Sequence, residues 1–417
     1  MHICIFEDIA VTNFHPLVYF RPVYELRCGV FNLREKILRI LCTKNYSLHV
    51  RSDIAGYLSE ELPDMSINHL PDEDTLLING RLLGDDNLLK IFKKPPKDQK
   101  IFLSGNDIAA AFIKRENIQN FREQFAGKPF EKSNFDGFAS ENYIGRLVSY
   151  PWDLVHLTSD EIENDYRRFK ISRNIVNKIY PGARIIRPSK VIIGKGSVVK
   201  PCAVLDADKG PIIIGRNVTV MPNAVIEGPA YIGDNAIIKI GAKIYHGTSI
   251  GEWCKVGGEV EASIIHSYSN KQHEGFLGHS YLGSWVNIGA DTNTSDLKNN
   301  YSTVRVHVNG RLIDSGKQFV GLTMGDHSKS GINVMFDTGT VVGASCNIYG
   351  AGLPPKFVPS FAWGGEKQYV EFKFEKSIET MKRVMARRSV VMSADYEKLA
   401  GKIFTQTANE RDKAGIK

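Results

Sequence analysis

Branched apolar residues recur every six positions through the middle of the chain. The unbroken series comprises Ile214, Val220, Ile226, Ile232, Ile238, Ile244, Ile250 and Val256, and glycine follows every third member. A period of six fits neither an α-helix of 3.6 residues per turn nor strict alternation along a strand, and a β-sandwich would not hold eight positions in register. The pattern is typical of a β-solenoid, in which each short strand points one side chain inward and three strands make a turn of eighteen residues.

The same register extends beyond this series in both directions. Ile193-Gly194 precedes Ile214 by one turn plus three residues, and the register returns at Leu282-Gly283 and Ile288-Gly289. Two segments break the pattern, namely residues 258–281 and the Asn-, Asp-, Ser- and Thr-rich residues 293–320. We expect both to leave the solenoid as loops, where binding chemistry usually lies.

Different patterns flank the solenoid on both sides. Strand-like and helical pieces alternate before it, at His2–Phe6, Asn32–Leu41, Thr75–Ile78, Asn87–Phe92 and Lys100–Leu103, which indicates an α/β domain. A capping box at Thr158 predicts a connecting helix, and apolar spacing from Phe374 to Met385 predicts a C-terminal amphipathic helix. The expected parts are an α/β domain (1–157), a connecting helix and linker (158–187), the solenoid (188–353) and a helical tail (354–417).

Composition narrows the class of protein. The 417 residues carry a net charge of +7, and no apolar run is long enough to cross a membrane. The first residues lack a basic segment, so we expect no secretory signal. Six scattered cysteines without a C-x-x-C pair indicate reduced thiols and a cytoplasmic protein. The mild basic excess suits small phosphate-bearing ligands as well as nucleic acid, and we expect no nucleic-acid or membrane partner.

Two motifs resemble a known family. Residues 271–278 (KQHEGFLG) and 282–292 (LGSWVNIGADT) are similar to the acetyltransferase half of bifunctional UDP-N-acetylglucosamine pyrophosphorylase/glucosamine-1-phosphate N-acetyltransferases. Residues 15–36 resemble a divergent bacterial branch of these enzymes. The resemblance implies a nucleotidyltransferase-like domain, a left-handed β-helix of hexapeptide repeats, and a homotrimer that holds acetyl-CoA between neighbouring solenoids. Its substrates would be acetyl-CoA, glucosamine 1-phosphate and UTP.

His273 is the candidate general base of the acetyl transfer. Attack of an amine on a thioester needs a base, and the pKa of imidazole lies near working pH. Gly275 and Gly278 beside it would allow close approach of a ligand. The resemblance assigns the same role to His273 and makes the backbone N–H of Ala290 the oxyanion donor.

Further site residues come from the resemblance alone. Lys239 stands where the family has an arginine that grips the sugar phosphate, and Asn287 matches an asparagine that contacts the sugar. Phe276 replaces a tyrosine of the sugar pocket. The remaining candidates are Asn300 and Tyr301 for the sugar, Glu259 or Glu261 as the supporting carboxylate, and Thr340 and Gly343 for the wall around acetyl-CoA.

The N-terminal domain departs from the nucleotidyltransferase pattern. It has no glycine before Gly29, and Arg81 stands where an aspartate usually holds the Mg²⁺ that such a domain would use. Its remaining candidate phosphate ligands are cationic, namely Arg21, Arg27, Arg34 and Lys36. Asp8, Asp107 and Asp153 are weak metal candidates, and the metal, if there is one, stays unknown.

Three functions therefore stay open at this stage. The first is acetyl transfer to glucosamine 1-phosphate, with or without transfer of a uridylyl group to give UDP-N-acetylglucosamine. The second is a sugar-1-phosphate nucleotidyltransferase, using UTP or dTTP, whose solenoid mainly oligomerises. The third is a structural or regulatory trimer without catalysis.

Overall fold

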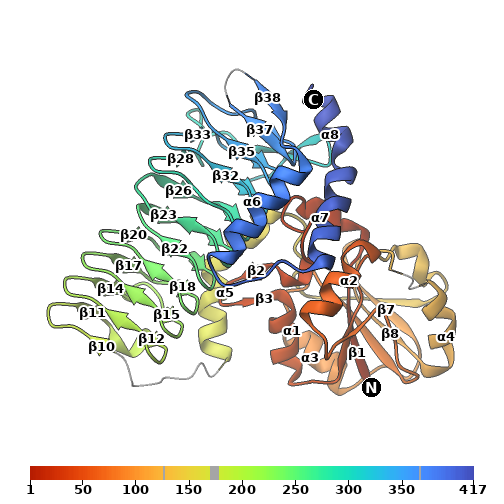
Figure 1. The fold of residues 1–417 in the computed structure, drawn as a ribbon. Coiled ribbons are helices and arrows are strands. Elements are labelled where there is room, and N and C mark those ends of the chain that lie inside the picture. Colours follow the sequence, from red (N-terminus) through yellow and green to blue (C-terminus); the bar gives the residue numbers. More distant parts are fainter. Residues whose placement is uncertain (125–126, 170–177, 366–367) are drawn as a thin grey trace.

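The computed structural model describes residues 1–124, 127–169, 178–365 and 368–417, and these form an N-terminal α/β domain, a long β-solenoid and C-terminal helices (Figure 1). This architecture confirms the predicted fold class. The N-terminal sheet has the order β5-β4-β1-β6-β8-β7-β9, in which β1, β4, β5 and β6 are parallel and β8 is antiparallel to β6 and β7. These strands are β1 (His2–Phe6), β4 (Tyr46–Leu48), β5 (Ser66–Ile67), β6 (Thr75–Asn79), β7 (Lys100–Ser104), β8 (Asp107–Ile113) and β9 (Ala139–Asn142).

Four helices and a small hairpin complete the N-terminal domain. The helices are α1 (Leu33–Leu41), α2 (Ser52–Glu61), α3 (Asp86–Lys93) and α4 (Arg115–Gln124), and the hairpin is β2 (Arg27–Cys28) with β3 (Phe31–Asn32). Asn32 caps α1 through a reciprocal bond with Glu35, which explains why this helix begins one residue after its predicted start.

The solenoid is a left-handed β-helix with three faces of short parallel strands. The first face contains β10 (Lys178–Ile179), β13 (Val198–Val199), β16 (Thr219–Val220), β19 (Ile237–Ile238), β22 (Lys255–Val256) and β25 (Asn270–Lys271), continued by β32 (Lys329–Ser330), β35 (Asn347–Ile348), β37 (Ala362–Gly364) and β38 (Tyr369–Glu371). The second face contains β11 (Arg184–Ile186), β14 (Val204–Asp206), β17 (Val225–Glu227), β20 (Lys243–Ile244), β23 (Glu259–Glu261) and β26 (Phe276–Gly278), continued by β28 (Asn293–Thr294) and β33 (Met335–Phe336).

The third face contains β12 (Val191–Ile193), β15 (Ile212–Ile214), β18 (Ala230–Ile232), β21 (Thr248–Ile250), β24 (Ile264–Ile265), β27 (Tyr281–Leu282), β31 (Thr323–Met324), β34 (Val341–Val342) and β36 (Phe357–Val358). The predicted period is visible in its register, since Ile214 pairs with Ile232 and Ile232 with Ile250. All eight residues of the sequence series are buried in the solenoid core.

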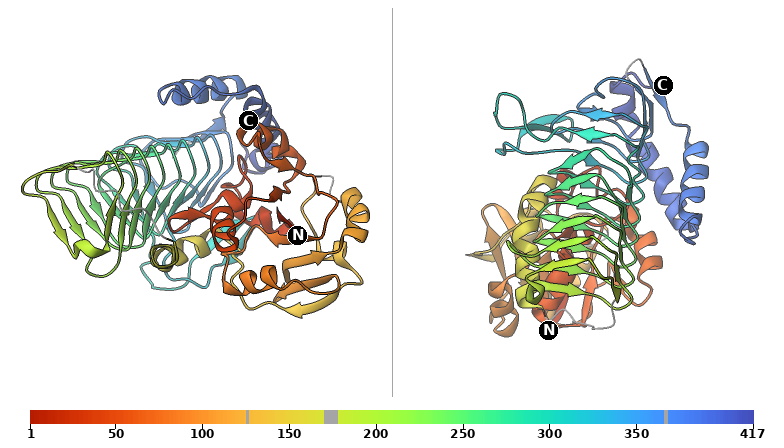
Figure 2. Two further views of the ribbon diagram at one scale, coloured as in Figure 1. Left: turned by 90° about the horizontal axis from the view of Figure 1, so that it is seen from below. Right: turned by 90° about the vertical axis from the view of Figure 1, so that its left-hand side faces the viewer.

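Residues 258–281 do not leave the solenoid, contrary to the expectation from sequence. Ile265 pairs with Ile250, fifteen residues earlier, and with Leu282, seventeen residues later. The two coils are shortened at their turns while the strands stay stacked, and this removes the six-residue period from the sequence. Of residues 293–320, Asn293–Thr294 stay in the second face as β28. The rest leaves the solenoid and includes the hairpin of β29 (Arg305–Val308) and β30 (Arg311–Asp314), which projects in the right-hand view of Figure 2.

The elements between and after the two domains differ from the predicted boundaries. The connecting helix α5 (Pro151–Arg168) begins about two turns before Thr158, because Asp153 caps it by accepting from the backbone N–H groups of Ser149 and Tyr150. Thr158 lies inside α5, where its hydroxyl donates to Leu154 O. The first solenoid strand starts at Lys178 and the last third-face strand ends at Val358, so the solenoid is longer than 188–353 at both ends.

The tail consists of α6 (Phe374–Ala386), α7 (Ala394–Gln406) and α8 (Ala408–Lys413). The predicted apolar stripe of α6 is confirmed, since Ile378, Met381 and Met385 are buried. α7 packs against α2 of the N-terminal domain, and α5 packs against the third face of the solenoid (Figures 1 and 2). One apolar core therefore joins all three parts of the chain. In the described part of the chain, no helix combines the length and apolarity needed to cross a bilayer.

Candidate functional site

His273 lies in the turn between β25 and β26 and is exposed to solvent. This turn belongs to the edge between the first and second faces, which we call the 1–2 edge and define by the turns that hold Lys239, His273 and Ala290. The two glycines beside His273 serve coil stacking: a Cβ on Gly275 would lie 2.2 Å from Thr292 O, and one on Gly278 would lie 2.3 Å from the Asp296 carboxylate. The close approach predicted for a ligand is thus made by the next coil.

Lys271 fixes the turn that carries His273, and sequence reasoning missed it. Its buried ammonium donates to His273 O at 3.0 Å and to Gly257 O at 3.2 Å. Burial lowers the pKa of this ammonium to about 8. A lysine directed into a solenoid turn is recognisable in sequence only once its strand register is known.

Ala290 lies on the 1–2 edge, one coil after His273. Its carbonyl accepts a hydrogen bond from Asn333 N, while the next residue, Asp291, donates to Glu274 O. Within the described residues, the N–H of Ala290 has no hydrogen-bond acceptor. A backbone N–H without an internal partner suits the oxyanion role that the resemblance implies.

Lys239 occupies the same edge two coils before His273, and its neighbours are basic. A Cβ on Gly257, in the coil between them, would lie 3.0 Å from Lys239 Cβ. The pKa of Lys255 on β22 is lowered by burial first and then by the charges of Arg388, Lys239 and Arg387. Arg388, just after α6, also donates to the Asn270 side chain at 3.0 Å. The tail thus adds two arginines to the basic group around Lys239, which sequence reasoning had not connected.

The predicted carboxylates and Asn287 lie beside this edge. Glu259 and Glu261 are on β23 of the second face, in the coil before His273. In the described chain, neither carboxylate makes a hydrogen bond or ion pair with His273. Asn287 is on the first face, where its backbone bridges Asn270 and Lys329.

Four weaker candidates lie elsewhere. Asn300 and Tyr301 belong to the projecting segment, whose hairpin tip reaches Thr12 of the N-terminal domain through Asn309. Thr340 is fully buried and its hydroxyl donates to Asp337 O, and a Cβ on Gly343 would lie 2.3 Å from Ser360 N. Thr340 and Gly343 adjoin β34 of the third face, away from the 1–2 edge, so neither forms a wall beside His273 of this chain.

The four N-terminal cations are all paired inside the protein. Arg21 and Arg27 reach the solenoid, where they bind Asp326 and Glu252. The buried ammonium of Lys36 contacts two carboxylates of α5, and Arg34 binds Glu25 within its own domain. Arg21, Arg27 and Lys36 therefore form ion pairs that connect the N-terminal domain to the solenoid and to α5.

Arg81 stands at the position where the resemblance would place a metal-binding aspartate of the N-terminal domain. It is fully buried after β6, and its guanidinium bonds Asp8 at 2.9 Å through Nε and Asp107 at 2.8 Å through Nη2. The carboxylate of Asp153 caps α5 by accepting hydrogen bonds from backbone N–H groups, so it is already engaged. The described residues contain no group of three metal-binding side chains. Because these carboxylates already neutralise a cation of the chain, the residues present do not fit a bound Mg²⁺.

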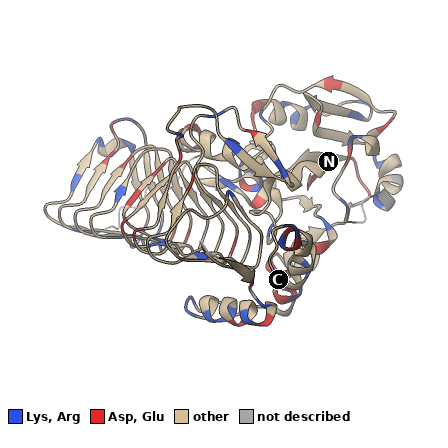
Figure 3. Cartoon of the chain, turned by 90° about the horizontal axis from the view of Figure 1, so that it is seen from above, with Lys and Arg blue, Asp and Glu red and all other residues tan. Residues whose placement is uncertain are grey.

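Charged residues of both signs are interspersed along the solenoid and α6 (Figure 3). Residues 3–174 match the family model of sugar nucleotidyl transferases, and residues 211–239 and 229–261 match the model of the bacterial transferase hexapeptide.

Three curated proteins are similar to parts of the chain. A bifunctional sugar-1-phosphate nucleotidylyltransferase/acetyltransferase of Sulfurisphaera tokodaii is 34% identical over 174 residues, 36% of this chain and 43% of that protein. Bifunctional GlmU proteins of Methanococcus vannielii and Methanocaldococcus jannaschii are 30% and 32% identical, over 64% and 49% of this chain. The chain spans 43%, 62% and 42% of the lengths of these three relatives.

Proposed function

We propose that this chain transfers the acetyl group of acetyl-CoA to the amine of glucosamine 1-phosphate at the 1–2 edge. The observation that carries the proposal is the presence on one edge of an exposed imidazole, an unpartnered backbone N–H and a basic group, at His273, Ala290 and Lys239. The similarity of both halves of the chain to bifunctional nucleotidylyltransferase/acetyltransferases supports the same chemistry.

The reaction follows from these groups. Lys239 binds the phosphate and directs the amine toward the thioester carbonyl. His273 takes a proton as nitrogen attacks carbon, and the N–H of Ala290 stabilises the negative oxygen. Collapse of this intermediate breaks the C–S bond, and the imidazolium returns the proton to the CoA thiolate.

The basis for a trimer is the exposed apolar character of the same edge. Ile240, Ile332 and Tyr349 are 59%, 68% and 50% exposed, and each lies in a turn of the 1–2 edge. The N-terminal domain and α5 cover the third face, which leaves the 1–2 edge open to a neighbour. We place acetyl-CoA between neighbouring solenoids, because a convex edge alone offers no walls to a pantetheine arm. We also place the enzyme in the cytoplasm, where its six free cysteines would stay reduced.

The direct test is an assay of the purified full chain with acetyl-CoA and glucosamine 1-phosphate. Release of the CoA thiol, with formation of N-acetylglucosamine 1-phosphate by mass spectrometry, is the expected result. Glucose 1-phosphate, which lacks the amine, is the matched control and should release no thiol. Failure to acetylate any amino-sugar phosphate would contradict the proposal.

Nucleotidyl transfer is the second candidate, favoured by the family match of residues 3–174. It is tested by release of pyrophosphate from UTP or dTTP with a sugar 1-phosphate. The pairing of Arg21, Arg27, Arg34 and Lys36, together with Arg81 between two aspartates, makes us expect no such activity. Absence of both activities would favour the third candidate, a structural or regulatory trimer.

A further inference from the structure

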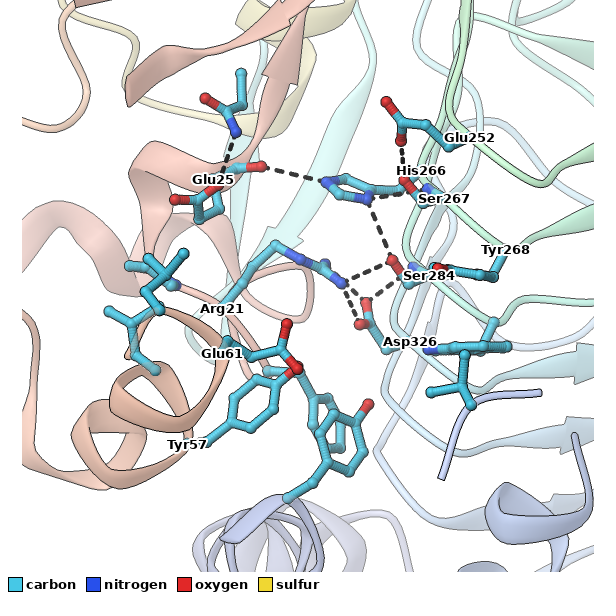
Figure 4. A pocket seen from close by; sticks show the side chains of 18 of the residues that line it. Arg21, Glu25, Tyr57, Glu61, Glu252, His266, Ser267, Tyr268, Ser284 and Asp326 are labelled. Atoms are coloured by element: carbon cyan, nitrogen blue, oxygen red, sulfur yellow. Dashed lines mark hydrogen bonds and ion pairs between the residues drawn. The ribbon is translucent and has the colours of Figure 1, made fainter. Parts of the chain in front are cut away.

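A cavity of about 530 Å³ lies where the three parts of the chain meet, away from the 1–2 edge. Tyr57 and Glu61 of α2 project into it from the N-terminal side, facing Tyr268 and the turn of Ser284 on the solenoid side (Figure 4). The tail closes it with side chains that include Tyr396. The acetyl-transfer proposal uses none of these residues.

The lining carries more negative than positive charge. Three arginines line the cavity, and each is already in an ion pair with a carboxylate of the lining: Arg21 with Asp326, Arg27 with Glu252 and Arg34 with Glu25. Glu60 and Glu61 are exposed there, and no ion pair in the described chain involves them. This surplus of carboxylates favours a cationic ligand and opposes a phosphate.

The solenoid wall is aromatic at a position where earlier coils carry asparagine. Asn235 holds a left-handed backbone turn, with φ near +60°, at this edge of the solenoid. The next coils hold the same turn with Trp253, Tyr268 and Trp285, for which φ is +61°, +67° and +62°. A left-handed backbone conformation costs a bulky residue about 1 kcal/mol or more. Strain of this kind is found mainly at functional positions.

These rings form a parallel stack. The centroids of Tyr268 and Trp285 are 4.2 Å apart, and their planes differ by 10°. Tyr57 lies across the cavity, and burial, followed by the negative charge of Glu61, raises the pKa of its hydroxyl. Trp253 also stacks on Tyr268 and His327 on Trp285, with centroids 6.5 Å and 6.1 Å apart, so the ring faces are engaged within the stack. The stack therefore offers the edges of its rings as an apolar wall for a saturated ring.

A buried donor in the lining also lacks a partner. The Arg27 side chain is only 8% exposed, and its Nη atoms bond Val30 O and Glu252. Its Nε–H has no hydrogen-bond acceptor in the described chain. A ligand hydroxyl would supply the missing acceptor, whereas a purely apolar amine would not.

We propose that this cavity binds an amino sugar that carries no phosphate. Its ammonium binds Glu60 and Glu61, its ring packs beside the Tyr268–Trp285 stack, and a hydroxyl accepts the Nε–H of Arg27. Because the walls come from three parts of the chain, the ligand binds only to the docked arrangement and stabilises it. The proposal is independent of acetyl transfer at the 1–2 edge.

The test is calorimetric titration of the full chain with glucosamine, N-acetylglucosamine and glucosamine 1-phosphate, followed also by tryptophan fluorescence because Trp285 lines the cavity. We expect saturable 1:1 binding of glucosamine. Loss of the ammonium in N-acetylglucosamine should weaken binding by about tenfold or more, the usual effect of removing one charge-assisted bond. Addition of the phosphate should also weaken binding, because the carboxylate-rich lining repels a further negative charge.

Variants locate the bound sugar. Glu61→Gln should weaken glucosamine binding by about tenfold, while Glu116→Gln, an exposed substitution on α4, should leave it unchanged. Tyr268→Asn, which restores the residue type of earlier coils, should remove the fluorescence change. His273→Ala should bind glucosamine normally, which separates this cavity from the acetyl site.

Three results would overturn the proposal. These are an absence of saturable glucosamine binding, equal or tighter binding of the acetylated or phosphorylated sugar, and binding that Glu61→Gln leaves intact. Each result is independent of whether the chain acetylates anything.

Discussion

The guanidinium of Arg21 bonds the carboxylate of Asp326 although the two residues are 305 positions apart. Arg21 belongs to the N-terminal domain and Asp326 to a solenoid turn after β31. Asp326 is 1% exposed and Arg21 is 11% exposed, so the pair is nearly dry. Arg21 also donates to Ser284 of the neighbouring coil at 2.9 Å. This pair therefore links the two domains through a buried polar network.

Removal of Arg21 should destabilise the protein strongly. Arg21→Ala leaves the Asp326 carboxylate buried without a counterion, which typically costs about 3–5 kcal/mol. Thermal unfolding followed by circular dichroism measures the loss. Arg311→Ala, on the exposed hairpin, is the control and should change the melting temperature little. The double variant Arg21→Met/Asp326→Leu should recover part of the loss, and an unchanged melting temperature in Arg21→Ala would refute the linking role.

His273→Ala should lower the turnover number of acetyl transfer by about 10²–10⁴-fold, because the reaction loses its base. The fold should be retained, since His273 is exposed and its backbone contacts remain. His69→Ala, another exposed histidine, is the control for rate. Near-normal turnover in the His273 variant would remove this residue from the mechanism.

Lys239→Ala should raise the KM for glucosamine 1-phosphate more than it lowers kcat. The lysine binds the phosphate charge equally in the ground state and the transition state. Lys255→Ala should act in the same direction, because the two ammonium groups influence each other. Steady-state kinetics with both substrates varied would separate the effect on KM from the effect on kcat. An unchanged KM in both variants would show that the two lysines are solvated surface residues.

Lys271 should impose a pH dependence on stability. Burial lowers its pKa to about 8, against 10.5 in the unfolded chain. Between these two values the unfolded chain holds more protons, so the free energy of unfolding gains a contribution that rises with pH. The rise amounts to at most about 3 kcal/mol.

Lys271→Met should remove this contribution. The difference in unfolding free energy between wild type and variant, measured by urea denaturation from pH 7 to 10.5, should therefore change across that window. Buried Lys329, whose pKa burial also lowers to about 8, is present in both proteins and cancels from the difference. A pH-independent difference would show that Lys271 does not titrate as described.

Ile332→Glu should break the proposed trimer and reduce acetyl transfer with it. Ile332 is 68% exposed on the 1–2 edge, one coil after Ala290, whose carbonyl accepts from Asn333. A charge there would oppose burial between subunits. Light scattering gives the mass, and Leu312→Glu, a 56% exposed position on the hairpin, is the control. Full activity in a monomer would contradict an active site between subunits.

The sequence by itself determined the solenoid and much of the N-terminal domain. The six-residue series from Ile214 to Val256 specifies stacked strands because only inward positions must be apolar, and β1 spans His2–Phe6 as predicted. The motif around His273 and Ala290 places both on one edge as soon as the register is known. Local periodicity carries this information because each coil contacts mainly the coils next to it.

Only the tertiary structure decided what the polar residues do. Two shortened coils hide the register of residues 258–281, so sequence gave no sign that His273 sits in a tight turn above the Lys271 ammonium. From the sequence alone, Arg21 and Arg27 are predicted to bind phosphate. In the structure they bind Asp326 and Glu252, which lie more than 200 positions away in the chain. The physical reason is that a buried charged side chain must pair with an opposite charge that the fold brings close to it. Because that partner can lie anywhere along the chain, no local sequence pattern identifies it.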